Sequence, residues 1–232
     1  MSMPIGAIPV LPLKNTVLYP GVTQALRVGR DKSVKAVDMA ALKNNWILTL
    51  SQTHPDQSVE NVDDLNDVGT LCKIESIKGT AESGYFVVVR GYYRMKVSSF
   101  KAESEIFEAY AEQVDDIIDI DKPTQAALLN SLRQISREVL QLIPGNTDQV
   151  QELIAGIEDL ALLSHLAAAN AEIALAEKQK ILEMLNLKTR VMHLLTLLHG
   201  YKDSLHIQQD IRQKLNSKMG QNQREHILRE QM

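Results

Sequence analysis

Three histidines near the C-terminal end are the residues whose type and spacing most readily suggest chemistry. His193, His199 and His206 fall in a segment that reads as one helix. His199 and His206 share a helix face, but seven residues at 1.5 Å each place them about 10.5 Å apart. Two histidines of one helix bind a single metal ion only when they are three or four residues apart. The spacing therefore indicates surface or packing histidines and predicts no metal site.

An acidic segment, residues 115–123, is the second candidate for an ion site. It contains four aspartates followed by Lys122 and Pro123. It lacks the glycine hinge and the terminal glutamate that a calcium-binding loop requires. We interpret it as a solvated linker between two parts of the chain.

The sequence lacks the motifs that mark nucleotide-binding, metalloprotease and serine-hydrolase active sites. The sequence contains no Gly-x-x-x-x-Gly-Lys-Ser/Thr, no His-Glu-x-x-His and no Gly-x-Ser-x-Gly. The single cysteine, Cys72, lies in an expected strand and is interpreted as a buried thiol. Trp46, Tyr92 and Tyr93 favour core and cross-strand packing over a ligand platform. We predict no catalytic, cofactor-binding or metal-ligating residue, and hence no enzymatic activity of this chain by itself.

Bulk composition narrows the remaining functions. The 232 residues carry a net charge of −4, with 44% apolar, 23% charged and 4% aromatic residues. A chain of this length can bury one large or two small cores. Negative charge and few aromatic residues make nucleic-acid binding unlikely through this region. Without an apolar stretch long enough to span a bilayer, and without a signal peptide, we expect a cytoplasmic protein that does not contact membranes.

The first half of the chain carries the signals of a β-rich lobe. Runs of β-forming or alternating residues predict about six strands, and a helix is expected from Asp31 to about Asn45. Short connections make the pairing mostly antiparallel. Pro9 and Pro12 interrupt the first run, which favours an edge strand there. Gly91 suggests a bulge in the fifth strand. The expected strands are residues 8–13, 24–28, 46–50, 68–77, 85–97 and 106–114.

The second half reads as helical. Expected helices cover residues 124–142, a segment capped by Asn146 or Thr147, 160–174, 177–184 and 186–232. The predicted fold class is α+β, in which a mostly antiparallel lobe with one helix precedes an all-α bundle that ends in a very long helix. We place the divisions at residues 1–117 for the β lobe, 118–185 for the helical bundle and 186–232 for the long helix.

The long helix loses its apolar character along its length. Its first part is rich in leucine and valine, whereas its last part carries a narrow stripe of residues four apart, Ile211, Leu215 and Met219. A helix with so few apolar residues gains little stability from packing against the rest of its own chain. We expect the stripe to contact another module or subunit, and the helix to continue beyond Met232.

Several short segments, in order, resemble the N-terminal region of the ATP-dependent protease Lon family. The first is Pro-Val-Leu-Pro-Leu-Lys-Asn-Thr-Val-Leu-Tyr-Pro-Gly at residues 9–21. It is followed by Val-Gly-Arg-Asp-Lys-Ser-Val-Lys-Ala at 28–36, Asp-Asp-Leu-Asn-Asp-Val-Gly-Thr at 63–70 and Val-Val-Val-Arg-Gly-Tyr-Tyr-Arg at 87–94. Segments 177–183 and 223–231 also match. Together they extend over nearly the whole chain.

The resemblance implies a substrate-recognition lobe, a helical bundle and a long helix that leads into an ATPase module. That module, with its ATP and Mg, and a peptidase domain with a Ser–Lys dyad would follow Met232. The expected role is recognition of misfolded, damaged and short-lived regulatory proteins, together with assembly of a hexamer. A stand-alone binding or adaptor module of the same fold is the alternative.

Recognition of unfolded chains requires exposed apolar surface with little sequence discrimination. Two stretches of the β lobe are candidates, although the alternative that the same side chains simply fill the core is the favoured interpretation. The candidate substrate-binding residues are Val17, Leu18, Tyr19, Pro20, Val22, Tyr92, Tyr93 and Met95.

Overall fold

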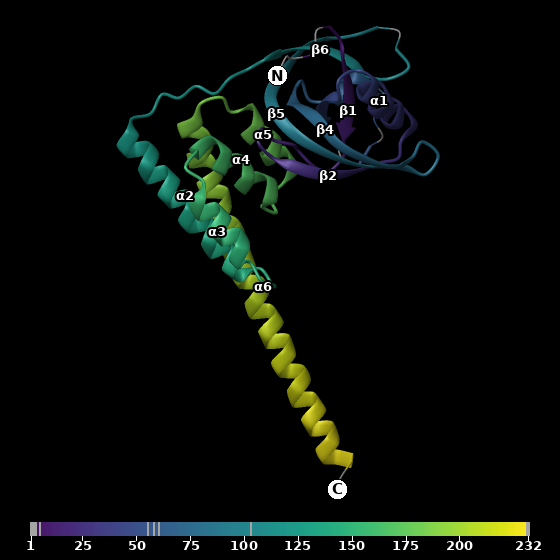
Figure 1. The fold of residues 1–232 in the computed structure, drawn as a ribbon. Coiled ribbons are helices and arrows are strands. Elements are labelled where there is room, and N and C mark those ends of the chain that lie inside the picture. The colour runs from purple at the N-terminus through teal and green to yellow at the C-terminus, as the bar shows by residue number, and fades with distance from the viewer. Residues whose placement is uncertain are drawn as a thin grey trace.

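A β-rich lobe, a helical lobe and one projecting helix make up the molecule (Figure 1). The computed structural model describes residues 4, 6–54, 56–57, 59, 61–102 and 104–230, and only the backbone of residues 216–230. The β lobe contains β1 (Ile8–Leu13), β2 (Thr23–Val28), α1 (Asp31–Leu42), β3 (Trp46–Ser51), a 3-10 turn (Val62–Asp64), β4 (Val68–Thr80), β5 (Gly84–Phe100) and β6 (Glu108–Gln113). The helical part contains α2 (Lys122–Leu142), α3 (Asp148–Gly156), α4 (Leu160–Asn170), α5 (Leu175–Glu183) and α6 (Leu187–Glu230).

The six strands form one sheet that closes on itself through its longest strand. The strand order is β2-β5-β4-β3-β1-β6, and β5 pairs with β6 as well. The first part of β5 lies between β2 and β4, while residues from Met95 to Phe100 pair with β6. All pairings are antiparallel except β1 with β3. The α+β class and the mostly antiparallel lobe are therefore confirmed.

The prediction that residues 8–13 form an edge strand is wrong. β1 pairs with β6 through Ile8 and Pro9, and with β3 from Val10 to Leu13. Each proline thus lies in a part of β1 that has a strand neighbour on one side only. Proline lacks a backbone N–H, so a strand tolerates it where no second neighbour needs that donor.

A bulge in β5 lies where the sequence predicts it. Leu71 pairs with Tyr93 and Cys72 with Gly91, which leaves Tyr92 as the extra residue. The Cys72 thiol is fully buried, as expected, and burial raises its pKa to about 12. The buried face of α1 packs through Val34 and Val37 on the apolar core of the sheet.

The helices begin largely where local sequence signals place them. Asp121 accepts a hydrogen bond from the Thr124 N–H at the start of α2, and Asp159 accepts two at the start of α4. The helix expected over 160–174 is shorter than predicted, since α4 ends at Asn170. Ala171 has an extended backbone with φ −74° and ψ 142°, and its N–H makes the last helical bond, to the Ala167 carbonyl.

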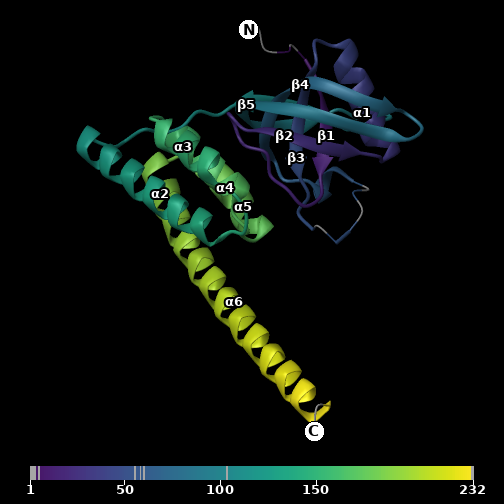
Figure 2. The ribbon, with the colours of Figure 1, turned by 60° about the horizontal axis from the view of Figure 1, so that its bottom comes forward.

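The projecting helix α6 begins inside the helical lobe and leaves it (Figure 2). Its first five turns are anchored by the buried side chains of Leu187, Val191, Leu194, Leu198 and Leu205. Within the described part of the chain, no helix has the length and apolar character needed to cross a membrane. The expected boundary at 117/118 falls between β6 and α2; the three-part division itself stays a prediction.

Candidate functional sites at the lobe joint and in the helical lobe

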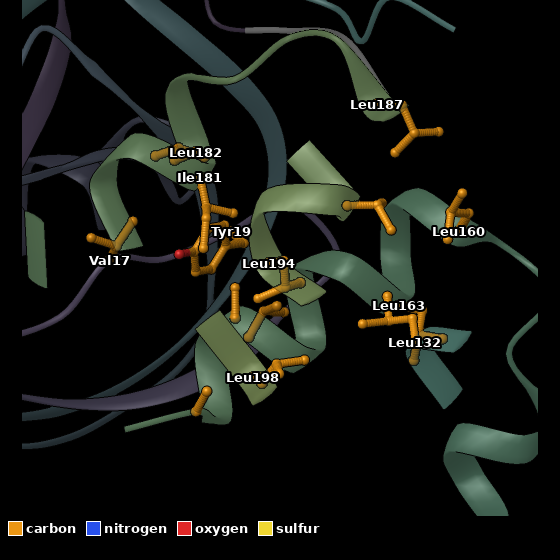
Figure 3. Packing of buried hydrophobic residues seen from close by; sticks show 14 of the residues in the cluster. Val17, Tyr19, Leu132, Leu160, Leu163, Ile181, Leu182, Leu187, Leu194 and Leu198 are labelled. Atoms are coloured by element: carbon orange, nitrogen blue, oxygen red, sulfur yellow. The ribbon is translucent and has the colours of Figure 1, made fainter. Parts of the chain in front are cut away.

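The apolar residues predicted to bind substrate divide between the core that joins the two lobes and the core of the β lobe. Val17, Tyr19 and Val22 belong to one buried cluster with side chains of α2, α4, α5 and α6 (Figure 3). Leu18 and Met95 are buried in the β lobe, and Pro20 is half-buried. These side chains therefore do not form an exposed apolar surface here, and the core alternative describes them. Their role in substrate binding stays a prediction.

Two glycines let the loop that carries Tyr19 lie close against its neighbours. The Gly21 N–H donates to the Gly91 carbonyl, and the Gly91 N–H donates to the Val22 carbonyl, both at 2.9 Å. A Cβ at Gly91 would collide with the Tyr19 carbonyl, and one at Gly21 with the Leu162 side chain. Gly21 also has a φ of +81°, which disfavours other residues.

Tyr92 and Tyr93 are half-buried and pack with Trp46. The Trp46 and Tyr92 rings meet edge to face with centroids 5.4 Å apart, and Tyr93 lies 6.3 Å from Trp46. Packing, favoured above a ligand platform from the sequence, describes all three rings.

Tyr19 links the lobes through its hydroxyl and its ring. The hydroxyl donates to the Lys178 carbonyl of α5 at 2.7 Å, and the ring stacks on His165 of α4 with centroids 5.5 Å apart. Burial raises the pKa of Tyr19, so the phenol stays protonated and keeps this donor. The Tyr19 side chain, fully buried, is thus a fixed contact between loop and helices.

Two arginines from different lobes share one carboxylate. Asp116 accepts from Arg94 of β5 at 2.5 Å and from both terminal nitrogens of Arg190 of α6, at 2.7 and 2.5 Å. Arg190 is fully buried and also donates to the Met184 carbonyl and the Ser164 hydroxyl. Burial opposes ionisation of Asp116, but the arginines outweigh it and lower its pKa to about 2. The bidentate pair is the strong form of a carboxylate–guanidinium contact.

The interpretation of residues 115–123 as a solvated linker is therefore wrong for its first part. Asp116 lies within the arginine pair, and Ile117 exchanges backbone hydrogen bonds with Leu185 and Leu187. The segment from Ile118, 63% exposed, to Asp121 remains a surface connection.

His165 completes the joint in its neutral form. Its Nδ1 lies 3.1 Å from the Pro20 carbonyl and its Nε2 3.3 Å from an Arg94 nitrogen. A guanidinium only donates, so Nε2 must accept from Arg94. The ring proton is therefore on Nδ1, which donates a hydrogen bond to the Pro20 carbonyl. Burial and the charges of Arg190 and Arg94 lower the pKa of His165 to about 3.

A second polar contact holds α5 against the sheet. Gln179 is buried; its amide oxygen accepts from Ser51 of β3 at 2.6 Å, and its nitrogen donates to the Val68 carbonyl of β4 at 2.9 Å. Together with the arginine pair, these bonds define one orientation of the helical lobe on the β lobe.

Sequence reasoning missed Arg94, Asp116, His165, Gln179 and Arg190. Their separations reach 145 residues, between Pro20 and His165, and no local period marks residues that meet over such distances. The one available signal was the presence of arginines within otherwise apolar runs, because a charge there requires a buried partner.

An apolar pocket of about 280 Å³ opens between α2, α3, α4 and α6. Its wall includes Val150 and Leu153 of α3, which are 47% and 61% exposed. No side chain of α3 is fully buried, and Ile154 packs partly buried against the core. The Ser136 hydroxyl lies in the wall, enclosed and without a hydrogen-bond partner among the described residues. The full lining is Ser136, Val139, Leu140, Ile143, Val150, Leu153, Ile154, Leu163, Leu166, Ala167, Asn170, Ala171 and Leu198.

The outer part of α6 carries an exposed apolar row. The Gln209 side chain donates to the Leu142 carbonyl at 3.0 Å and holds α6 to the end of α2. Ile207, Ile211 and Leu215, spaced four apart, are 60%, 53% and 57% exposed. The Met219 side chain lies outside the described residues. A contact of this face with another module stays a prediction.

The three histidines of α6 do not come together in one site. His193 contacts the Glu177 carboxylate at 2.5 Å, and His199 and His206 are exposed. Across the side chains that the structure describes, no three His, Cys, Asp or Glu residues gather in a group that could hold a metal ion.

Comparison with known proteins matches this fold and sequence to one family. Residues 7–200 match the family described as ATP-dependent protease La (LON) substrate-binding domain. Lon protease 1 of Bdellovibrio bacteriovorus is 44% identical over 232 residues, which are all of this chain and 29% of that protein. Lon protease of Escherichia coli is 30% identical over 225 residues, 97% of this chain and 29% of its own length.

Solved structures agree on the fold. The N-terminal domain of Mycobacterium avium complex Lon protease has a TM-score of 0.66 at 17% identity, covering 85% of this chain and 98% of that one. The Lon N-terminal domain protein from Xanthomonas campestris has a TM-score of 0.58 at 17% identity, covering 83% and 98%. The chain spans less than a third of the length of its curated relatives. It belongs to the family of Lon protease substrate-binding domains.

Proposed function

We propose that this chain holds segments of unfolded polypeptide for an ATP-dependent protease, and that the apolar pocket beside α3 receives their apolar side chains. The observation that carries the proposal is the pocket itself. It is the place among the described residues where large apolar side chains, Val150 and Leu153, are exposed around an apolar hollow.

The size and lining of the pocket suit one or two side chains of a chain rather than a larger ligand. Pockets for drug-sized molecules begin at about 300 Å³. At about 280 Å³, this pocket takes a leucine- or phenylalanine-sized group. The unpartnered Ser136 hydroxyl would bond a backbone group of the bound segment and so recover the cost of its burial.

The weak attachment of α3 favours low sequence discrimination. A helix without a buried side chain is held by little apolar area, so small shifts of α3 cost little and let the pocket accept different shapes. Arg133 of α2 donates to the Ile157 carbonyl and ties the end of α3 in place. This arrangement suits damaged proteins, which share exposed apolar residues rather than a sequence.

The resemblance extends the proposal to the whole protease. We infer substrates that are misfolded, damaged or short-lived regulatory proteins, and a cytoplasmic location. The ATPase module, using ATP and Mg, and a Ser–Lys peptidase would act on what this region holds. This part of the protein supplies binding and not catalysis.

We also infer that the exposed row Ile207, Ile211 and Leu215 contributes to assembly of a homohexamer. Four-residue spacing gives a narrow apolar stripe, which suits packing against a second helix. In the full-length protease, Ile211→Asp with Leu215→Asp should reduce the hexamer fraction in sedimentation. Met192→Asp is the matched control, because Met192 is 53% exposed near the start of the same helix. Equal loss with both variants would contradict an assembly role for this row.

Peptide binding tests the pocket directly. Leu153→Asp places a charge at the pocket rim and should weaken binding of a labelled apolar peptide about tenfold or more, measured by fluorescence anisotropy. Ile118→Asp is the control, because Ile118 is 63% exposed in the connection before α2 and does not line the pocket.

Both variants change surface residues, so their thermal unfolding should stay close to that of the parent. Equal peptide affinity of Leu153→Asp and the parent protein would show that the pocket is not where the peptide binds. Binding that weakens equally in both variants would indicate general charge repulsion instead.

A further inference from the structure

A second cavity, with both cationic and apolar residues in its wall, lies in the β lobe at the start of α1. It has a volume of about 190 Å³ and is bounded by the end of β1, by β2 and by the first turn of α1. The strand pairing explains why space remains there. Among the described residues, β2 pairs with β5 only, and β1 from Leu11 onward pairs with β3 only, so neither stretch has a strand partner on its other side.

Three cations line this cavity. Lys14, Arg27 and Arg30 contribute to its wall, and within the described residues none of them forms an ion pair. Arg30 donates to the Gln52 amide oxygen at 3.1 Å, and the Arg27 guanidinium lies 5.9 Å from the centre of the Phe86 ring. Asp31, the first residue of α1, is exposed and does not line the cavity. The cavity is therefore positive.

The first turn of α1 offers backbone donors beside these cations. The first bond within the helix runs from the Val34 N–H to the Arg30 carbonyl, and Arg30 provides no side-chain cap. The N–H groups of residues 31–33 consequently have no partner within the helix. A negative group at such a terminus gains from these donors and from the helix dipole.

Ser33 is an independent indication of a ligand. It lines the cavity, is only 5% exposed and forms no hydrogen bond with any described residue. The Ser33 hydroxyl is not among the fully enclosed side-chain atoms, so it reaches the open space of the cavity and can donate to a group bound there. An acceptor in the cavity would satisfy it. The hydroxyl without a protein partner, the cations and the helix terminus all favour a ligand that accepts hydrogen bonds and is negatively charged.

We propose that this cavity binds one oxyanion group, of the carboxylate or phosphate class. The Ser33 hydroxyl and the N–H groups of the first turn donate to its oxygens, and Lys14, Arg27 and Arg30 neutralise its charge. The group is either the terminal carboxylate of a polypeptide or free inorganic phosphate. The site lies in the other lobe from the apolar pocket and does not depend on the function proposed for that pocket.

Backbone amide shifts under titration distinguish the two sources. The whole chain, labelled with ¹⁵N, is titrated at constant ionic strength with inorganic phosphate, with a short alanine peptide and with the same peptide amidated at its C-terminus. Saturable shifts of the amides of residues 29–34 with phosphate, or with the free but not the amidated peptide, support the proposal and identify the source. No saturable shift with either anion up to about 10 mM would overturn it.

Three variants test the assigned contacts. Ser33→Ala and Arg30→Gln should each weaken anion binding about tenfold, the amount expected for losing one bond to a charged group. Lys35→Gln is the control, because Lys35 lies on the same helix but pairs with the exposed Glu105 and does not line the cavity. An equal loss in the Lys35 variant would overturn the site in favour of general attraction to a basic surface.

Discussion

The joint between the lobes and the pocket beside α3 share helices α4 and α6 but are built in opposite ways. At the joint, Tyr19, Arg94 and Arg190 are at most 4% exposed and bond across the two lobes. In the pocket, Val150 and Leu153 are about half exposed and meet no polar partner, while the Ser136 hydroxyl stays unbonded.

The difference is one of directionality. Hydrogen bonds and bidentate ion pairs require specific distances and angles, so the joint allows one orientation of the lobes. Apolar contact is not directional, so the pocket can accept different side chains at similar cost. A rigid joint beside an adaptable pocket is the arrangement that the proposed binding of varied polypeptide segments requires.

Breaking the joint should have the largest effect. Arg190→Ala leaves the Asp116 carboxylate with Arg94 alone and removes a fully buried side chain, so we expect a loss of about 3–5 kcal/mol of unfolding free energy. Urea denaturation measures the change. Lys188→Ala, an exposed lysine two residues earlier in α6, is the control and should change stability by less than about 0.5 kcal/mol. A loss as small as that of the control would mean the ion pair does not hold the lobes.

Acid should weaken the joint and not the pocket. His165 has a pKa of about 3 in the folded protein and about 6.5 when unfolded, so the unfolded state binds a proton first as the pH falls. Stability is then fully present above about pH 6.5 and falls by at most about 1.4 kcal/mol per pH unit toward pH 3. Asp116, with a folded pKa of about 2, adds a further loss only below about pH 4.

Urea midpoints measured from pH 7 to 4.5 check this prediction. His165→Gln can keep a donor and an acceptor but cannot titrate, and its midpoint should fall less steeply than that of the parent. Parallel slopes for the two proteins would show that other groups cause the acid loss.

Enlarging a residue in the pocket and enlarging a buried neighbour should have different effects on stability. Ala167 lines the pocket, so Ala167→Leu should change stability by less than about 1 kcal/mol while weakening peptide binding. The neighbouring Ala168 is fully buried and outside the pocket, and Ala168→Leu should cost about 1–3 kcal/mol. Thermal unfolding compares the two, and equal costs would mean that the pocket is not open in solution.

The smallest effect is expected in α6. Gly200 lies inside the helix with open space around its Cα, so Gly200→Ala should stabilise the protein by about 0.5–1 kcal/mol. Gly21→Ala is the contrasting change at the joint, since it meets Leu162 and a positive φ, and it should destabilise. Differential scanning calorimetry resolves both signs; destabilisation by Gly200→Ala would mean that α6 is not helical there.

Local pattern predicted most elements but not their neighbours. The range expected for β1 is the observed one, and the bulge at Gly91 is where glycine indicated it. Pro9 and Pro12 suggested an edge strand, because proline has no backbone N–H to donate. The sequence does not show on which side of the strand, or along which part of it, a neighbouring strand pairs. Tyr19 and Val22 suggested surface for a similar reason: a turn sequence predicts a loop but not what packs against that loop.

The sequence by itself determined the class of fold, the family, the buried Cys72 and the polar character of the outer α6, since each depends on residue type and on spacing over a few turns or strands. Only the tertiary structure decided that Asp116 joins Arg94 to Arg190, that His165 stays neutral and that the pocket forms beside α3. Those features depend on contacts between residues as many as 145 positions apart, such as His165 with Pro20. A buried charge or an open hollow is set by what surrounds it in space, and neighbours in sequence do not specify that environment.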